Sequence, residues 1–305
     1  MSAIITISTQ IFILILLGIL CRSVGILEQN GRDQISRLVF NIALPCLLFT
    51  TAVETDLAAI SGKAALCFAA GVLVPLPAYA IGQIAAVLGR TNGTQRQVIR
   101  VGAALSNTAF IGIPICTLLW GPQAGLLASL YDQGINLPIF ILGPAGYAAK
   151  PDLKSIRRAL LNPMILSMLT GFLFNMLHLQ LPELFMTPLK ITGNMTTPLA
   201  LILIGSLLDF SRIRPFALKP LLLLSTSRLL VVPLFIFTLA IVLQFEPILS
   251  QVIIMQAAMP TSVLATLMAF EYRSDETLAV QGNILTVLAS PLTLAFFAAL
   301  IRWQF

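Results

Sequence analysis

Charged residues are scarce in this sequence. Only 10% of the 305 residues are Asp, Glu, Lys or Arg, whereas 58% are hydrophobic. A soluble domain carries about 25% charged residues, so most of the surface must face something other than water. This shortage excludes an ordinary soluble domain.

Motifs for metal binding and for enzyme chemistry are also missing. The sequence has no CxxC pair, no HExxH, no GxSxG and no paired acidic residues inside an apolar run. The four cysteines lie within or at the ends of apolar segments, where they serve as small hydrophobic side chains. We therefore expect no enzyme activity, no metal and no cofactor. The net charge of +6 is spread over connections rather than gathered in one patch, so we expect no nucleic-acid partner.

Long apolar runs are what the sequence does contain. Runs near twenty residues match a hydrocarbon core about 30 Å thick at about 1.5 Å rise per residue. The predicted fold class is an all-α polytopic membrane protein of about ten helices. The ten expected spans are 4–26, 34–53, 64–88, 98–120, 124–148, 163–179, 188–208, 217–243, 248–270 and 277–302.

Basic residues divide unequally between the two sides of the membrane. The connections after the odd-numbered spans hold 14 Lys and Arg residues, and the opposite side, with both termini, holds 3. Cytoplasmic connections carry the excess of Lys and Arg. We therefore expect a multi-pass protein of the inner (plasma) membrane with both termini outside the cytoplasm.

The sequence repeats itself at an offset of 153 positions. When the sequence is shifted by this offset, glycine, proline and asparagine positions of the first half align with corresponding positions of the second half in four of the five helices. The matches are Gly18 with Gly171, Asn41 and Pro45 with Asn194 and Pro198, Asn107–Thr108 with Pro260–Thr261, and Pro138 with Pro291. The predicted domains are therefore a first five-helix repeat at 1–153 and a second at 154–305.

An odd number of helices in each repeat inverts the second repeat relative to the first. Inverted repeats recur in secondary transporters, because the pseudo-two-fold symmetry relates outward-open and inward-open states. The alternative is a duplicated membrane protein that carries nothing.

Two expected helices contain residues that disfavour an unbroken α-helix. The fourth span holds Asn107, Gly112 and Pro114, and the ninth holds Pro260. Proline removes a backbone donor and clashes one turn back. Because Asn107 and Pro260 are repeat mates, we expect two broken helices that cross near the midplane, with breaks at Gly112, Pro114 and Pro260. The alternative is that these prolines kink the helices for packing alone.

A crossing of this kind would suit a carboxylate. The half-helix N-termini would each present about half a positive charge to one spot. The expected substrate-binding residues carry amide, hydroxyl or imide groups at or beside the breaks: Asn107, Thr108, Pro260, Thr261, Ser262, Asn136 and Asn283.

Two ionisable residues lie well inside apolar spans. Asp132 is in the fifth span and Arg228 is in the eighth. Charged residues within membrane helices are rare and are usually functional. We expect Asp132 to carry a coupling proton, and Arg228 to meet the substrate carboxylate or to pair with Asp132. Either could instead be a structural charge that faces a water-filled vestibule.

The motifs as a set resemble the auxin efflux carrier family, which includes plant auxin exporters and bacterial carriers linked to malonate and other carboxylates. The resemblance spans the whole chain and rests on segments 41–45, 106–114, 162–163, 198–205 and 258–260. It implies a scaffold of helices 1, 2, 6 and 7, a transport domain of helices 3–5 and 8–10 that moves as an elevator, and a homodimer formed through the scaffold.

The sequence also departs from the plant exporters. Their crossover carries Asn-Pro-Asn in both repeats, whereas here Ser106 precedes Asn107 and the second crossover reads Met259, Pro260, Thr261. A bacterial carboxylate carrier for malonate or malate is therefore the closer match than an auxin exporter. The remaining alternatives are a sodium-coupled symporter of the bile-acid type and a membrane receptor that binds without transport.

Overall fold

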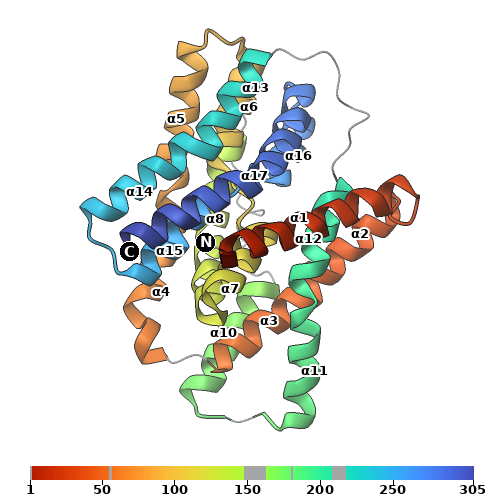
Figure 1. The fold of residues 1–305 in the computed structure, drawn as a ribbon, viewed down its shortest axis with the longest axis vertical. Coiled ribbons are helices and arrows are strands. Elements are labelled where there is room, and N and C mark those ends of the chain that lie inside the picture. The colour runs from red at the N-terminus through yellow and green to blue at the C-terminus, as the bar shows by residue number, and fades with distance from the viewer. Residues whose placement is uncertain (1, 55–56, 148–162, 180, 208–217) are drawn as a thin grey trace.

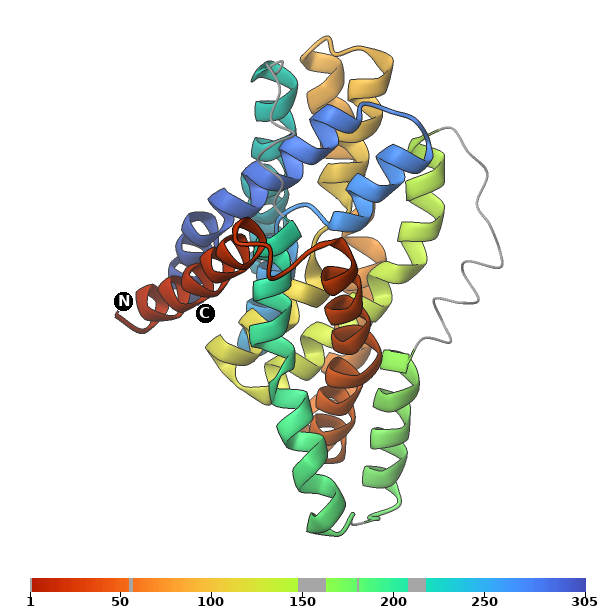
Figure 2. The ribbon, with the colours of Figure 1, turned by 90° about the vertical axis from the view of Figure 1, so that its right-hand side faces the viewer.

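The computed structural model describes residues 2–54, 57–147, 163–179, 181–207 and 218–305. Helices make up nearly all of these residues, and an isolated antiparallel bridge is the β-type pairing found among them. The helices group into ten consecutive segments, as the sequence predicted. Figures 1 and 2 show them as one elongated bundle.

The first five segments follow one another up to residue 146. Their helices are α1 (Ser2–Ser23), α2 (Gln29–Leu38), η1 (Val39–Ala43), α3 (Leu44–Glu54), α4 (Leu57–Leu73), α5 (Pro75–Leu88), α6 (Gly93–Ala104), η2 (Thr108–Gly112), α7 (Ile113–Trp120) and α8 (Pro122–Gly146).

The second five segments begin at residue 163. Their helices are α10 (Pro163–Met176), α11 (Glu183–Asn194), α12 (Thr196–Leu207), α13 (Leu218–Thr226), η4 (Ser227–Val231), α14 (Val232–Val242), α15 (Pro247–Ala257), α16 (Val263–Glu271) and α17 (Glu276–Gln304).

Within the described residues, four continuous helical stretches are long and apolar enough to cross a membrane. They are Gln29–Glu54, Gly62–Leu88, Leu218–Val242 and Glu276–Gln304. Large apolar side chains are exposed on the outside of the bundle, as at Leu88, Leu184 and Leu292, each more than three-quarters exposed. Such a surface is stable against lipid rather than water, which confirms the all-α polytopic membrane class.

Three π-helical segments, η1, η2 and η4, share a cause that the sequence displays. Each ends two residues before a proline, at Pro45, Pro114 and Pro233 respectively. Proline cannot donate to the carbonyl one turn back and clashes with it. A wider π turn at that place accommodates the ring while the helix continues.

The helices pack in two groups. In one group α1 packs along α12, and α3 packs along α10 and α11. In the other, α4 and α7 pack on α8, α5 packs on α6, and α14 packs on α15. Figure 1 shows the first group toward the lower right and α5, α13 and α14 at the upper left.

Two close contacts within the first group are related by the repeat offset. A Cβ atom at Gly18 of α1 would lie 2.0 Å from the carbonyl oxygen of Ile202, and one at Gly171 of α10 would lie 2.7 Å from that of Phe49. Gly18 and Gly171 are 153 positions apart, and so are Phe49 and Ile202. Equivalent helices of the two halves therefore make exchanged, equivalent contacts, as a pseudo-two-fold axis requires.

Candidate functional site at the helix crossover

The helix of the fourth segment is interrupted between Ala104 and Thr108. Leu105 leaves the helical conformation with φ −97° and ψ 106°, and Asn107 has φ −83° and ψ 67°. Helix resumes at Thr108 as η2 and continues into α7. Residues 105–107 therefore form a short extended strand in the middle of the segment.

The helix of the ninth segment is interrupted in the same way. It ends at Ala257, and α16 begins at Val263. Pro260 lies in the gap and is buried with its neighbours Met259 and Thr261. Residues 258–262 form the second extended segment.

The two extended segments cross and pair as antiparallel strands. The Asn107 amide donates to the Pro260 carbonyl at 2.8 Å, and the Ser262 amide donates to the Leu105 carbonyl at 2.9 Å. Ser106 and Thr261 stand opposite each other as the bridge pair. Backbone groups buried within lipid need partners inside the protein, and here each break supplies the partners of the other.

The position of the first break differs from the prediction. Gly112 is the last residue of η2 and Pro114 is the second residue of α7, so neither interrupts the helix. Proline fits near the start of an α-helix, where the missing donor would lack an intrahelical partner anyway. Gly112 has another reason to be glycine, because a Cβ there would lie 1.9 Å from Gln256 Oε1.

The helices that resume after the breaks are capped by side chains from the breaks. Asn107 Oδ1 accepts from the Phe110 amide at 3.3 Å, and Ser262 Oγ accepts from the Leu264 amide at 3.2 Å. Each cap satisfies one of the first backbone donors of its helix. The positive ends of η2 and α16 thus both begin at the crossing.

Asp132 lies beside the first of these helix starts. Its Oδ1 accepts a 2.5 Å hydrogen bond from Thr108 Oγ1, and its Oδ2 accepts from Gln133 Nε2 at 3.4 Å. The Asp132 side chain is 5% exposed and belongs to α8. The structure therefore brings together Thr108 and Asp132, two residues that the sequence predicted separately.

Arg228 lies at the ends of the helices that precede the breaks. Its Nη1 donates to the Ala103 carbonyl of α6 at 2.7 Å, and its Nη2 donates to the Ala257 carbonyl of α15. Its side chain is 1% exposed. Both terminal nitrogens are thus engaged by backbone carbonyls rather than by the Asp132 carboxylate, whereas the buried Nε has no hydrogen-bond partner in the protein.

Residues of α17 hold the second break in place. Asn283 Nδ2 donates to the Thr261 carbonyl at 2.9 Å, and the Thr261 amide donates to Thr286 Oγ1 at 3.3 Å. Thr261 Oγ1 also donates to the Gly102 carbonyl of α6 at 3.3 Å. Asn136, predicted for the same cavity, lies in α8 with its side chain outside the described residues.

Among the described residues, four buried polar atoms near the crossover have no hydrogen-bond partner in the protein. They are Asn107 Nδ2, Tyr131 Oη, Arg228 Nε and Gln256 Oε1. Gln256 is anchored to α8 through a 2.9 Å bond from its Nε2 to the Ala128 carbonyl. Buried polar groups are normally satisfied by protein, water or ligand, so these are the groups at the crossover that a water or a ligand could still satisfy.

Gln256 and Tyr131 were missed by the interpretation of the sequence. Gln256 stands four residues before Pro260 in an otherwise apolar span, and Tyr131 precedes Asp132. A polar residue within one helical turn of a break was the signal that could have identified Gln256.

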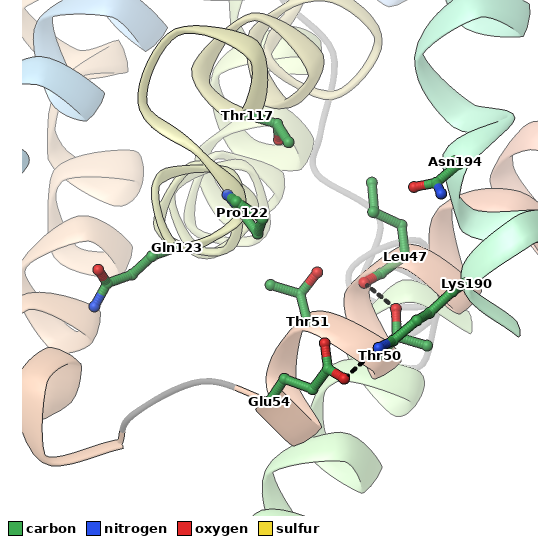
Figure 3. A pocket seen from close by; sticks show the side chains of 9 residues that line it. All are labelled: Leu47, Thr50, Thr51, Glu54, Thr117, Pro122, Gln123, Lys190 and Asn194. Carbon is green, nitrogen blue, oxygen red and sulfur yellow. Dashed lines mark hydrogen bonds and ion pairs between the residues drawn. The ribbon is translucent and has the colours of Figure 1, made fainter. Parts of the chain in front are cut away.

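A cavity of about 510 Å³ lies outside the crossover, between the two helix groups. Figure 3 shows Glu54 of α3 and Lys190 of α11 forming an ion pair on its wall, with Thr117 of α7 and Gln123 of α8 on the other side of the cavity. The described lining contains no crossover residue. The cavity borders α7, the helix that begins beyond Asn107 and η2, at the far end of that helix from the crossing.

Comparison with known proteins agrees with this architecture. Residues 3–143 and 150–298 match a family described as "Membrane transport protein". An uncharacterized transporter of Methanothermobacter thermautotrophicus is 28% identical over 293 residues, covering 93% of this chain and 95% of its own length. An uncharacterized transporter of Methanocaldococcus jannaschii is 24% identical over 302 residues, covering 94% and 95%. The chain belongs to the membrane transport protein family, which is that of the auxin efflux carriers.

Proposed function

We propose that this membrane transporter carries a small organic anion, such as malonate, malate or another carboxylate, and binds it at the crossover. The observation that carries the proposal is the unpaired side-chain amide nitrogen of Asn107. Its Oδ1 caps η2, while its Nδ2 is buried, with the residue 3% exposed, and has no partner in the protein. A carboxylate oxygen is an acceptor that this amide lacks.

The two helix starts at the crossover favour an anion over a cation when the Asp132 carboxyl beside η2 carries its proton. Each helix N-terminus carries the equivalent of about half a positive charge, and η2 and α16 both start here. Backbone donors of a half-helix start bind anionic substrate groups in other transporters with inverted repeats. The negative ends of α6 and α15, by contrast, already meet the Arg228 cation.

The packing of the helices supports an elevator motion. Helices α1, α3, α10, α11 and α12 form the group expected to be the scaffold, and the crossover belongs entirely to the other group. The cavity lined by Glu54, Gln123 and Lys190 lies at the boundary of the two groups. On the predicted topology it opens on the non-cytoplasmic side. Movement of the crossover group along the scaffold would carry the bound anion past this boundary, in a homodimer held through the scaffold helices.

The proposal is tested by uptake of radiolabelled mono- and dicarboxylates into proteoliposomes, with and without sodium and pH gradients. We expect saturable, counterflow-competent uptake that does not require sodium. Asn107→Ala should abolish uptake and leave monodisperse protein, because the donor to the carboxylate is lost. Asn92→Ala is the matched control, since Asn92 caps α6 with a 2.8 Å bond from the Gln95 amide far from the crossing.

Three results would contradict parts of the proposal. Full uptake by Asn107→Ala would remove the crossover as the binding site. Uptake that depends on a sodium gradient would favour the bile-acid type of symport. Carboxylate binding without flux in any condition would favour a receptor.

A further inference from the structure

A single buried guanidinium joins the ends of the two helices that precede the breaks. Arg228 donates to Ala103 in the last turn of α6 and to Ala257, the last residue of α15. The last four carbonyls of an α-helix have no intrahelical donor. One side chain thus satisfies orphan carbonyls of two helices from different repeats.

The position of Arg228 follows from the sequence of its own helix. Pro233 imposes the π turn η4, which runs from Ser227 to Val231 and contains Arg228. A π turn shifts the direction of the side chains it holds relative to an α-helix. The neighbouring carbonyl of Gly102 accepts a hydrogen bond from Thr261 across the crossing, so two carbonyls in the last turn of α6 are satisfied by residues of the second repeat.

The negative helix ends at the crossing lie at Arg228, and the positive helix ends are the helix starts that follow the breaks. The ends of α6 and α15 each carry the equivalent of about half a negative charge, which the Arg228 cation offsets in a setting with little water to screen it. The starts of η2 and α16 are the positive ends at the crossing, and the Asp132 carboxyl lies beside the start of η2. Without Arg228, two unpaired carbonyls and two negative helix ends would face each other within the lipid-embedded core.

We propose that Arg228 is the positioning residue of the crossover: it holds the ends of α6 and α15 together, keeps the paired segments 105–107 and 258–262 in register, and does not contact the substrate. Binding of the carboxylate therefore depends on Arg228 indirectly, because Arg228 fixes the positions of Asn107 and of the two helix starts. This last consequence rests on the proposed function, whereas the effect on the register of the crossover does not.

Hydrogen exchange at the crossover tests the effect on register directly. The amides of Asn107 and Ser262 make the cross-strand bonds, so peptides that contain them report opening of the pair. In Arg228→Met we expect these amides to exchange at least about ten-fold faster than in the wild type, which corresponds to about 1.4 kcal/mol. Exchange in α10 and α11, which lie in the other helix group, should not change.

Arg100→Met is the control for removing a partly buried cation from a helix-end carbonyl. Arg100 donates through Nε at 3.0 Å to the Gly146 carbonyl, the end of α8. It therefore has the same chemistry at a different helix end. We expect Arg100→Met to leave exchange at Asn107 and Ser262 at the wild-type rate.

If Arg228→Met does not fold, Arg228→Lys tests whether Arg228 keeps the crossover segments in register. Lysine keeps the charge but lacks the planar fork that reaches two acceptors at once, so we expect exchange about three-fold faster than wild type at the same two amides. Wild-type exchange in the folded Met variant, or in the Lys variant where Met does not fold, would overturn the proposal.

Carboxylate binding separates positioning from direct contact. We expect Arg228→Met or Arg228→Lys to raise the Kd at an unchanged number of sites per folded chain, in step with the faster exchange. A raised Kd with wild-type exchange would mean that Arg228 contacts the ligand, which would overturn the positioning role. If the wild type binds no carboxylate, the proposed function fails and the exchange measurement still decides the role of Arg228.

Discussion

The crossover and the glycine contacts of the α1–α12 pair show two ways to bring helices together inside a membrane. At the α1–α12 contact, Gly18 and Gly205 remove side chains so that backbones touch, and a Cβ at Gly205 would lie 1.9 Å from the Ile15 carbonyl oxygen. At the crossover the backbones touch because they are unwound and pair with each other. The first contact leaves nothing for a ligand, whereas the second leaves polar groups that the protein does not satisfy.

The comparison assigns rigid packing to the α1–α12 contact and ligand-accessible polar groups to the crossover. Close helix packing through small residues depends on shape and tolerates no added volume. The crossover depends on hydrogen bonds and helix-end charges, which a ligand can extend. Substitutions in the two regions should therefore fail in different ways.

The largest effect is expected from added volume at the glycine contact. Gly205→Leu should destabilise the fold by about 3 kcal/mol or more, because the clash is with backbone rather than with a movable side chain. The measurement is the thermal unfolding midpoint and the monodisperse fraction in detergent. Gly62→Leu is the control, since a Cβ at Gly62 would meet nothing within 4 Å. Equal stability of the two variants would contradict the account of this contact.

A smaller substitution at the crossover should remove binding without unfolding. Asn107→Asp keeps the Oδ1 acceptor that caps η2 but replaces the buried donor with a second oxygen. We expect carboxylate binding at least about 100-fold weaker, or about 2.8 kcal/mol, with the unfolding midpoint close to that of the wild type. Asn92→Asp, at the exposed cap of α6, should bind normally. Wild-type affinity in Asn107→Asp would contradict a donor role for Asn107.

Substitution of Asp132 should affect uptake driven by a pH gradient more than it affects the affinity for the carboxylate. Asp132→Asn keeps the acceptor for Thr108 while removing the ability to carry a proton. We expect uptake driven by a pH gradient to be lost while counterflow persists. Asp275→Asn, at the cap of α17, is the control. An unchanged pH profile of uptake in Asp132→Asn would end its proposed proton role.

The smallest effect is expected at the ion pair on the cavity wall. Glu54 and Lys190 are each about half exposed, at 52% and 45%, and exposed ion pairs contribute roughly 0–1 kcal/mol. Glu54→Gln should change the free energy of unfolding by less than about 1 kcal/mol in a chemical or thermal melt. A loss of several kcal/mol would show that the pair holds α3 and α11 together.

The positions of glycine, proline and asparagine residues made much of the architecture predictable from the sequence. The offset between Asn107 and Pro260 predicted the crossing, and these two residues are joined by a backbone hydrogen bond. Glycine and proline carry strong local conformational preferences, so their repetition is informative even in an apolar chain.

Details that depend on which side of a helix faces which neighbour were not predictable. Proline at 114 was interpreted as a break, but a π turn before it absorbs the strain and the helix continues. For Arg228 the sequence left a carboxylate partner and a structural role both open, because it shows the charge but not the two carbonyls that the π turn brings within reach. Gln256 and Tyr131 gave no repeat signal at all.

Ligand protection in hydrogen exchange tests the central claim most directly. With a transported carboxylate at saturating concentration, we predict slower exchange in peptides covering residues 105–112 and 258–266, and no change across the α1–α12 contact. Protection confined to peptides that line the Glu54–Lys190 cavity, with the crossover unchanged, would contradict an anion site between the two broken helices.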